Sequence, residues 1–142
     1  MFHLTLEDEL FISQPKQIGT HSNQHEHLAV VFEDDGDTGY FYAIDTQQND
    51  AIVDCLHIYN VTSVEQKEIA RKLQICWSED GYLALLLIND YPHAVFDFKK
   101  LIAYNNNQFP QPAITSLWSH KLITDDLVKQ WLSSEENNCT RQ

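Results

Sequence analysis

Glycine and basic residues are both scarce in this chain of 142 residues. Glycine occurs four times, and no P-loop, dinucleotide-binding or G-x-S-x-G pattern is present. Loops that hold phosphate groups are rich in glycine, so we expect no nucleotide and no other cofactor. The longest apolar runs are far shorter than the roughly 18 residues that a membrane helix needs. The sequence therefore predicts a protein without a bound cofactor and without a membrane partner.

The shortage of basic residues gives the chain a strong negative charge. Lys and Arg total 9 against 21 Asp and Glu, for a formal net charge of −12. Such a charge repels nucleic acid phosphates and anionic membrane surfaces. We therefore expect no nucleic acid partner, and a basic protein is the partner that the charge favours. Solubility alone is the alternative explanation of the charge.

Cysteine is also sparse, with Cys55, Cys76 and Cys139 but no C-x-x-C pair. An odd number without a recurrent spacing is more typical of a reducing compartment than of a disulfide framework. The first ten residues, MFHLTLEDEL, contain neither the basic segment nor the apolar core of a signal peptide. We therefore predict a cytoplasmic protein.

Short apolar runs separated by turn residues indicate strands. Residues 28–32 and 40–44 flank EDDGDTG, whose Asp and Gly residues suit a hairpin turn. The run YLALLLI, residues 82–88, is apolar on both faces and predicts a strand between layers, with Leu86 in the core. Alternation in residues 73–77 predicts that Trp77 is also core, whereas the polar residues 14–27 are expected to form a long loop. The pattern predicts an α+β fold, a single domain dominated by an antiparallel meander sheet of about six or seven strands.

Two segments have features of helices. Ser63 and Gln66 match a capping box at the start of SVEQKEIARKL, residues 63–73, which predicts a short helix. In ITDDLVKQWL, residues 123–132, Thr124 is a candidate N-cap before an amphipathic stripe. The second segment predicts a C-terminal helix packed on the sheet. We place the globular domain at residues 1–134 and expect a disordered polar tail at residues 135–142.

His93 and Asp97 in INDYPHAVFDF, residues 88–98, are the first candidates for a catalytic pair. On a strand they share one face with Val95, opposite Phe96 and Phe98. Residues four apart on a strand lie about 13 Å from each other, which is too far for a hydrogen-bonded dyad. We therefore predict no catalytic residues here, and we expect the His93 face to meet solvent or a cleft.

Two segments contain possible metal ligands. THSNQHEH includes His21, His25 and His27, but no H-E-x-x-H motif or cysteine pair completes a zinc site. EDDGDTG is rich in carboxylates but does not follow the EF-hand pattern. A solvated loop and a hairpin turn explain these segments, so no metal site is predicted.

Tyrosine and histidine alternate with apolar residues along the predicted strands. If those strands align, the aromatic residues would form one surface with polar tips, suited to a ligand or a protein partner. The alternative is that tyrosine simply packs at the margin of a sheet. The candidate surface consists of Tyr40, Tyr42, His57, Tyr59 and His93.

The middle of the chain resembles a known bacterial family. The strings FEDDGDTGYFYAID, LHIYNV, WSEDG and INDYPHAVFDF, followed by Phe109 and Pro110, are similar to the family catalogued as domain of unknown function 2251. They fall within residues 28 to 110. The resemblance implies a small bacterial protein, and it brings no activity, cofactor or catalytic residue with it.

Two functional hypotheses follow from these observations. The first is a non-enzymatic domain that binds a protein or regulates one, for which an immunity-like inhibitor of a basic toxin is one model. The second is a small-molecule binder or a small enzyme that uses the Tyr/His surface. The absence of catalytic motifs favours the first.

Overall fold

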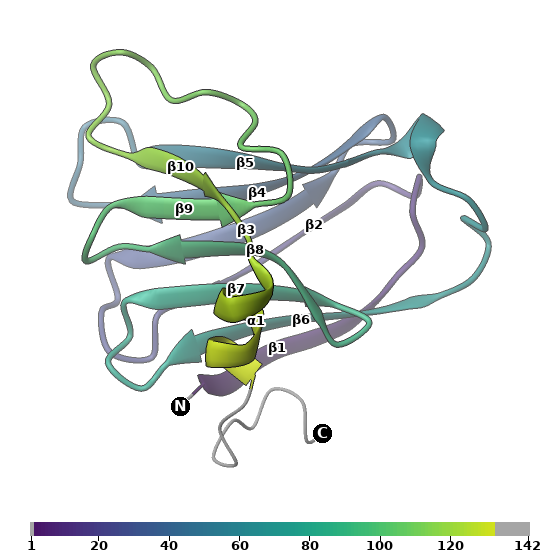
Figure 1. Cartoon of the computed structure of the whole chain (residues 1–142), viewed down its shortest axis with the longest axis horizontal. Helices are drawn as coiled ribbons and strands as arrows, with labels where there is room; N and C mark the ends of the chain where they lie inside the picture. The colour runs from purple at the N-terminus through teal and green to yellow at the C-terminus, as the bar shows by residue number, and fades with distance from the viewer. Residues whose placement is uncertain (1, 133–142) are drawn as a thin grey trace.

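The computed structural model describes residues 2–132, whose strands form two sheets that pack face to face (Figure 1). Sheet A has six strands in the order β1-β6-β7-β8-β9-β10, and sheet B has four in the order β2-β3-β4-β5. The strands of sheet A are β1 (Phe2–Leu10), β6 (Arg71–Ser78), β7 (Leu83–Ile88), β8 (Tyr91–Asp97), β9 (Ile102–Asn105) and β10 (Ser119–Leu122). Those of sheet B are β2 (Lys16–His21), β3 (Leu28–Asp34), β4 (Thr38–Asp45) and β5 (Ile52–Asn60).

The strand-rich fold with one C-terminal helix is as predicted, but the single meander sheet is wrong. Residues Lys16–His21, which we expected in a loop, form β2 at the edge of sheet B. Strands β9 and β10 pair in parallel, which makes sheet A mixed. A turn signal marks the end of a strand, but it does not specify whether the next strand pairs with it or crosses to another layer.

The helix predicted for residues 63–73 is also wrong. The structure has a short 3-10 helix, η1 (Val61–Ser63), and β6 begins at Arg71. Gln66 has φ of 54°, a left-handed conformation that a continuous helix excludes. The Arg71 guanidinium donates to the carbonyl oxygens of Glu65, Gln66 and Ile69 and holds this turn. Leu73 is fully buried as part of β6, and this tertiary packing outweighs the local preference for a helix.

The main core lies between the two sheets. The rings of Phe41 from sheet B and Phe96 from sheet A stack with centroids 5.2 Å apart. Trp77 and Leu86, both predicted as core, are fully buried there. This interdigitation of the two inner faces is what joins the sheets into one unit.

A second core lies on the outer face of sheet A, under α1 (Asp125–Leu132). Thr124 Oγ1 accepts a hydrogen bond from the Leu127 amide at 3.2 Å, which confirms the predicted cap. Trp131 packs with Leu85 and Val95, and Figure 1 shows the helix in front of the six-stranded sheet. Because Leu85 and Leu86 point into different cores, β7 is the strand between layers that its apolar run predicted.

The expectation that the His93 face meets solvent or a cleft is wrong. Val95 is fully buried and Asp97 is 9% exposed, because this face of sheet A carries the second core and does not meet solvent.

None of the helices in residues 2–132 has the length and apolar character needed to span a membrane. The predicted polar tail, residues 135–142, lies outside the described residues.

Candidate functional site

The outer face of sheet B carries three of the five predicted surface residues together. Tyr40 lies with its ring centroid 6.0 Å from that of Tyr42 and 5.9 Å from that of His57. All three side chains are half-buried. The Tyr42 hydroxyl points to a carboxylate oxygen of Glu33 at 3.4 Å, and burial followed by neighbouring acidic groups raises the pKa of Tyr42 to about 12. This group, Tyr40, Tyr42 and His57, is called the aromatic face below.

Hydrogen bonds fix both the orientation and the tautomer of His57. Its Nδ1 accepts from the Asn107 side-chain amide at 2.9 Å, and its Nε2 lies 3.0 Å from the Asn60 side-chain oxygen. Since the Asn107 amide is a donor and the Asn60 side-chain oxygen is an acceptor, these contacts match the tautomer with its proton on Nε2. Phe109 extends the aromatic face, because its ring packs edge-on against His57 at 5.8 Å and is 53% exposed.

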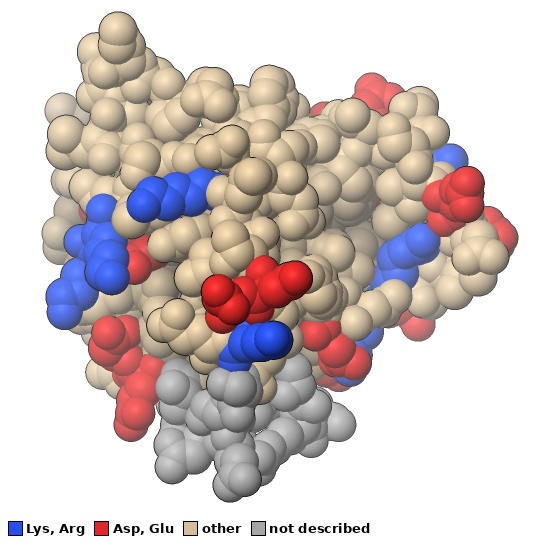
Figure 2. Space-filling view, viewed as in Figure 1, with Lys and Arg blue, Asp and Glu red and all other residues tan. Residues whose placement is uncertain are grey.

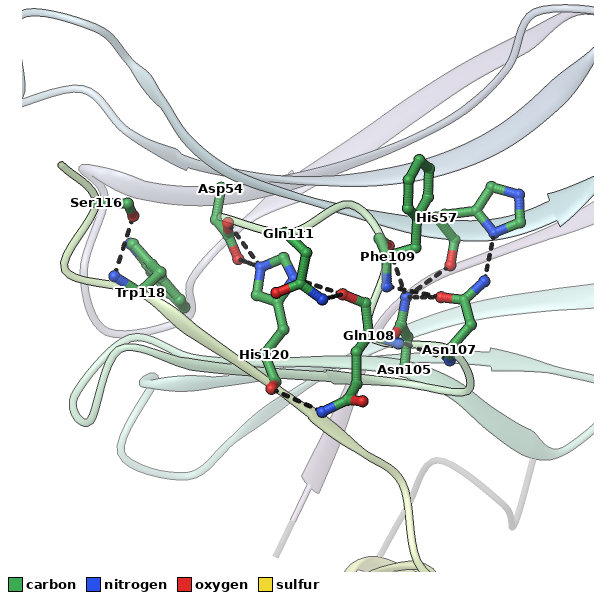
Figure 3. A network of polar contacts seen from close by, with 10 residues as sticks. All are labelled: Asp54, His57, Asn105, Asn107, Gln108, Phe109, Gln111, Ser116, Trp118 and His120. Carbon is green, nitrogen blue, oxygen red and sulfur yellow. Dashed lines mark hydrogen bonds and ion pairs between the residues drawn. The ribbon is translucent and has the colours of Figure 1, made fainter. Parts of the chain in front are cut away.

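Asn105 holds the loop that supports His57, as Figure 3 shows. Asn105 is fully buried at the end of β9, and its amide nitrogen donates to the carbonyl oxygens of His57 at 2.9 Å and Phe109 at 3.0 Å. Its side-chain oxygen accepts from the Gln108 amide at 2.7 Å. A residue of sheet A thereby ties residues 105–109 to β5 of sheet B, so the aromatic face has a rigid border.

A buried His–Asp pair makes a second link between β5 of sheet B and a strand of sheet A. The line along which these two links join the sheets is called the seam below. Nε2 of His120 in β10 lies 2.8 and 2.9 Å from the two carboxylate oxygens of Asp54 in β5, with side chains 1% and 6% exposed. The His120 Nδ1 lies 3.3 Å from the Gln108 carbonyl oxygen. Burial by itself lowers the pKa of His120, but the hydrogen bond and charge of Asp54 outweigh it and raise the pKa above its usual value. Because both ring nitrogens face acceptors, the geometry is that of an imidazolium–carboxylate pair.

This pair is built to join two sheets and not to activate a nucleophile. Both nitrogens of His120 are already used by Asp54 and Gln108, so neither is available to a reacting group. Cys55 is next to Asp54 in the chain, but burial, followed by the Asp54 charge, raises the pKa of its thiol to about 12. A thiol with so high a pKa is almost entirely protonated at neutral pH and is a poor nucleophile.

Tyr59 does not belong to the aromatic face. A β-bulge in the pairing of β4 with β5 places Tyr40 opposite His57 but Gly39 opposite Tyr59, with one extra residue between the two pairs. The ring of Tyr59 packs toward the main core over Gly39, where a Cβ would come within 2.6 Å of the ring. Its hydroxyl donates to the buried Asp34 carboxylate at 2.7 Å, and burial, with that bond, raises the pKa of Tyr59.

His93 also lies apart from the aromatic face, in β8 of sheet A. It occupies a bulge in the pairing of β8 with β7, and its ring lies 6.0 Å from that of Tyr91. Its Nδ1 is buried and has no hydrogen-bond partner among the described residues. Burial lowers the pKa of His93 to about 4, so the ring is neutral at neutral pH.

The histidines of residues 21–27 make local contacts. The His25 ring stacks on Tyr82 at 4.2 Å, and its Nε2 lies 3.0 Å from the Asp80 carbonyl oxygen. The His21 Nδ1 lies 3.0 Å from the Glu26 carbonyl oxygen. In the part of the chain that the structure describes, no three His, Cys, Asp or Glu side chains are grouped as metal ligands.

Sequence reasoning missed the residues that support the aromatic face. Asn105, Asn107, Asp54 and His120 are not among the residues predicted from the sequence, and Phe109 enters only through the family resemblance. The signal that was available is the Asn run at residues 105–107, since Asn side chains hydrogen-bond nearby backbone groups in turns. No local signal predicts the partner of His120, because Asp54 is 66 residues away.

Comparison with known proteins places the chain in a family. A family model described as an uncharacterised protein conserved in bacteria, DUF2251, matches residues 10–132. The chain belongs to the DUF2251 family. It is 62% identical over 133 residues to an uncharacterised protein of Haemophilus influenzae, and the match covers 93% of this chain and 83% of that protein. No solved structure matches the chain. The predicted family resemblance is confirmed.

Proposed function

We propose that this DUF2251 protein is a non-enzymatic binding domain that docks a basic protein on its aromatic face. The observation that carries the proposal is the cluster of Tyr40, Tyr42 and His57, with ring centroids about 6 Å apart on the outer face of sheet B. Half-exposed tyrosine and histidine offer an apolar ring together with a polar tip, which is the chemistry enriched in protein interfaces.

The charge around this face favours a basic partner. Glu33 lies beside Tyr42, and the chain as a whole has a net charge of −12. An arginine of the partner would stack on a tyrosine ring while its guanidinium meets the Glu33 carboxylate. The chemistry of Cys55 and His120 also favours binding over catalysis, because the thiol is protonated and the imidazole nitrogens are occupied.

The experiment is affinity capture with a matched pair of baits. Lysate of the bacterium that encodes the chain is passed over wild-type protein, over Tyr40→Ala/Tyr42→Ala, and over Tyr91→Ala, which removes an exposed tyrosine from sheet A. We expect one stoichiometric basic protein on the wild-type and Tyr91→Ala baits, and its loss from the double variant.

The second measurement is the salt dependence of binding between the protein and its captured partner. Association should slow steeply as ionic strength rises, because the Debye length falls from about 10 Å at 0.1 M to about 3 Å at 1 M. A partner that the double variant retains, an acidic partner, or an affinity that is flat over this range would contradict the proposal. A bound metabolite in native mass spectrometry, with no protein partner, would favour a small-molecule binder instead.

A further inference from the structure

A pocket of about 520 Å³ opens at the opposite end of β5 from His57, between the β4–β5 hairpin and residues 115–118. Its size is within the range of small-molecule sites, which is roughly 300–1,000 Å³. The proposed docking of a protein on the aromatic face does not use it.

The floor of the pocket is apolar and rigid. The ring of Trp118 meets that of Phe98 at 5.6 Å and nearly perpendicular, and Leu28 lies beside them. Trp118 is 8% exposed and its amide donates to the Ser116 hydroxyl at 3.0 Å. The Ser116 amide in turn donates to the Ala113 carbonyl oxygen at 2.8 Å. The floor is therefore formed before any ligand arrives, which reduces the entropy lost on binding.

The wall of the pocket is acidic. Asp45 and Asp50 both line it, from the two ends of the hairpin turn, and none of its described lining residues is Lys, Arg or His. The Asp45 Oδ1 accepts from the Gln47 amide at 3.0 Å, and the Asp45 amide donates to the Ala51 carbonyl oxygen at 2.8 Å. Carboxylates beside a low-dielectric apolar floor concentrate negative potential in the cavity, so a cation is the ligand charge that fits.

The mouth of the pocket exposes large apolar side chains to water. Leu117 is 84% exposed and Ile52 is 57% exposed, and both line the pocket. Figure 2 shows the segment between β9 and β10 as a surface nearly without charged residues at the top of that view. Exposed apolar groups around a cavity are typical of binding sites, and a ligand with an apolar body would cover them.

We propose that this pocket binds a small organic cation, an ammonium group on an aromatic body. The aromatic body lies against Trp118 and Phe98, and the ammonium group faces Asp45 and Asp50. The proposal does not depend on the aromatic face or on a protein partner.

The test uses three probes of similar shape but different charge with the whole 142-residue chain. 4-Phenylbutylamine is titrated by calorimetry beside the neutral 4-phenylbutan-1-ol and the anionic 4-phenylbutanoate. We expect the amine to bind about tenfold or more tightly than the anion, because the anion meets two carboxylates. Amide and indole chemical shifts should change at Leu101, Ser116 and Trp118, and not at Tyr40 or His57.

Two variants that each remove one negative charge distinguish an effect at the pocket from an effect of the protein's overall charge. Asp50→Asn removes a carboxylate from the pocket, and Asp126→Asn removes an exposed one from α1. We expect the first to weaken amine binding about threefold to fivefold, as a partly exposed ion pair does, and the second to leave it unchanged. Absence of saturable amine binding, equal affinity for the three probes, equal effects of the two variants, or shifts at the aromatic face would each overturn the proposal.

Discussion

On the outer face of sheet A, Leu85 and Val95 lie fully buried beneath Trp131 of α1, whereas on the outer face of sheet B, Tyr40 and Tyr42 stay half-exposed. Both faces are made by the same alternation along antiparallel strands. The difference is the helix, which covers one sheet and leaves the other to solvent. One outer face is therefore core, and the other has the exposure that binding requires.

The histidines of the two faces differ in the same way. His93 on sheet A is held neutral by burial, with a pKa of about 4 and no hydrogen-bond partner for Nδ1 among the described residues. His57 on sheet B has hydrogen bonds to Asn107 and Asn60 at 2.9 and 3.0 Å. The role of a histidine in an alternating strand therefore cannot be assigned until it is known what packs against that face of the sheet.

The largest effect is expected at the seam that holds sheet B and its aromatic face against sheet A. Asp54→Ala leaves the buried His120 without its carboxylate, and it should lower the free energy of unfolding by about 3–5 kcal/mol. Urea denaturation measures this loss. Asp8→Ala, which breaks the exposed Asp8–Lys16 pair, is the control and should cost under about 1 kcal/mol. Equal costs would mean that the seam pair contributes no more than a surface pair.

The seam pair also has a pH signature. Because the pKa of His120 is raised in the folded protein, its contribution is complete below the unfolded value of about 6.5 and is lost as pH rises through the folded pKa. Wild-type stability should therefore fall on the alkaline side, and Asp54→Ala should lack this part of the fall. Parallel pH curves for the two proteins would show that His120 is not charged in the folded state.

A cavity beneath α1 tests whether the outer face of sheet A is a core. Leu85→Ala should lower the free energy of unfolding by about 2–5 kcal/mol, from the lost transfer energy and the cavity. Urea denaturation again gives the value. A cost below about 1 kcal/mol would mean that α1 does not make this face a core.

Because of His93, we expect the free energy of unfolding to fall in acid. This pH dependence is opposite in sign to that expected from His120. As pH falls from 6.5 toward 4, the unfolded chain takes up the proton before folded His93 does, so stability is lost by up to about 3 kcal/mol. His93→Asn has no such titration. Urea denaturation of both proteins between pH 4 and 7 should give curves that diverge toward acid, and curves that remain parallel would place His93 in water.

The smallest effect is expected on the exposed face. Tyr40→Ala removes a half-exposed ring, so it should change the free energy of unfolding by less than about 1 kcal/mol while it weakens partner binding. Urea denaturation and the capture experiment measure the two effects on the same variant. A loss as large as that of Leu85→Ala would make the aromatic face a structural element.

The hairpin of β3 and β4, the buried run in β7 and the capped C-terminal helix could all be predicted from the chain. Each depends on local chemistry: Asp and Gly in a turn, apolar residues on both faces of a strand, and Thr124 before an amphipathic stripe. Tyr40, Tyr42 and His57 were likewise named from alternation alone, because the side chains of a strand alternate with a period of two.

The separation of the strands into two sheets was decided by the tertiary structure, as were the burial of His93, the bulge that turns Tyr59 inward and the pairing of His120 with Asp54. These features depend on contacts between residues far apart in the chain, such as Asp54 with His120, 66 positions later. Alternation specifies that a strand has two faces, but it contains no information on what packs against each of them. That depends on where α1 and the second sheet lie, and only the folded chain brings them there.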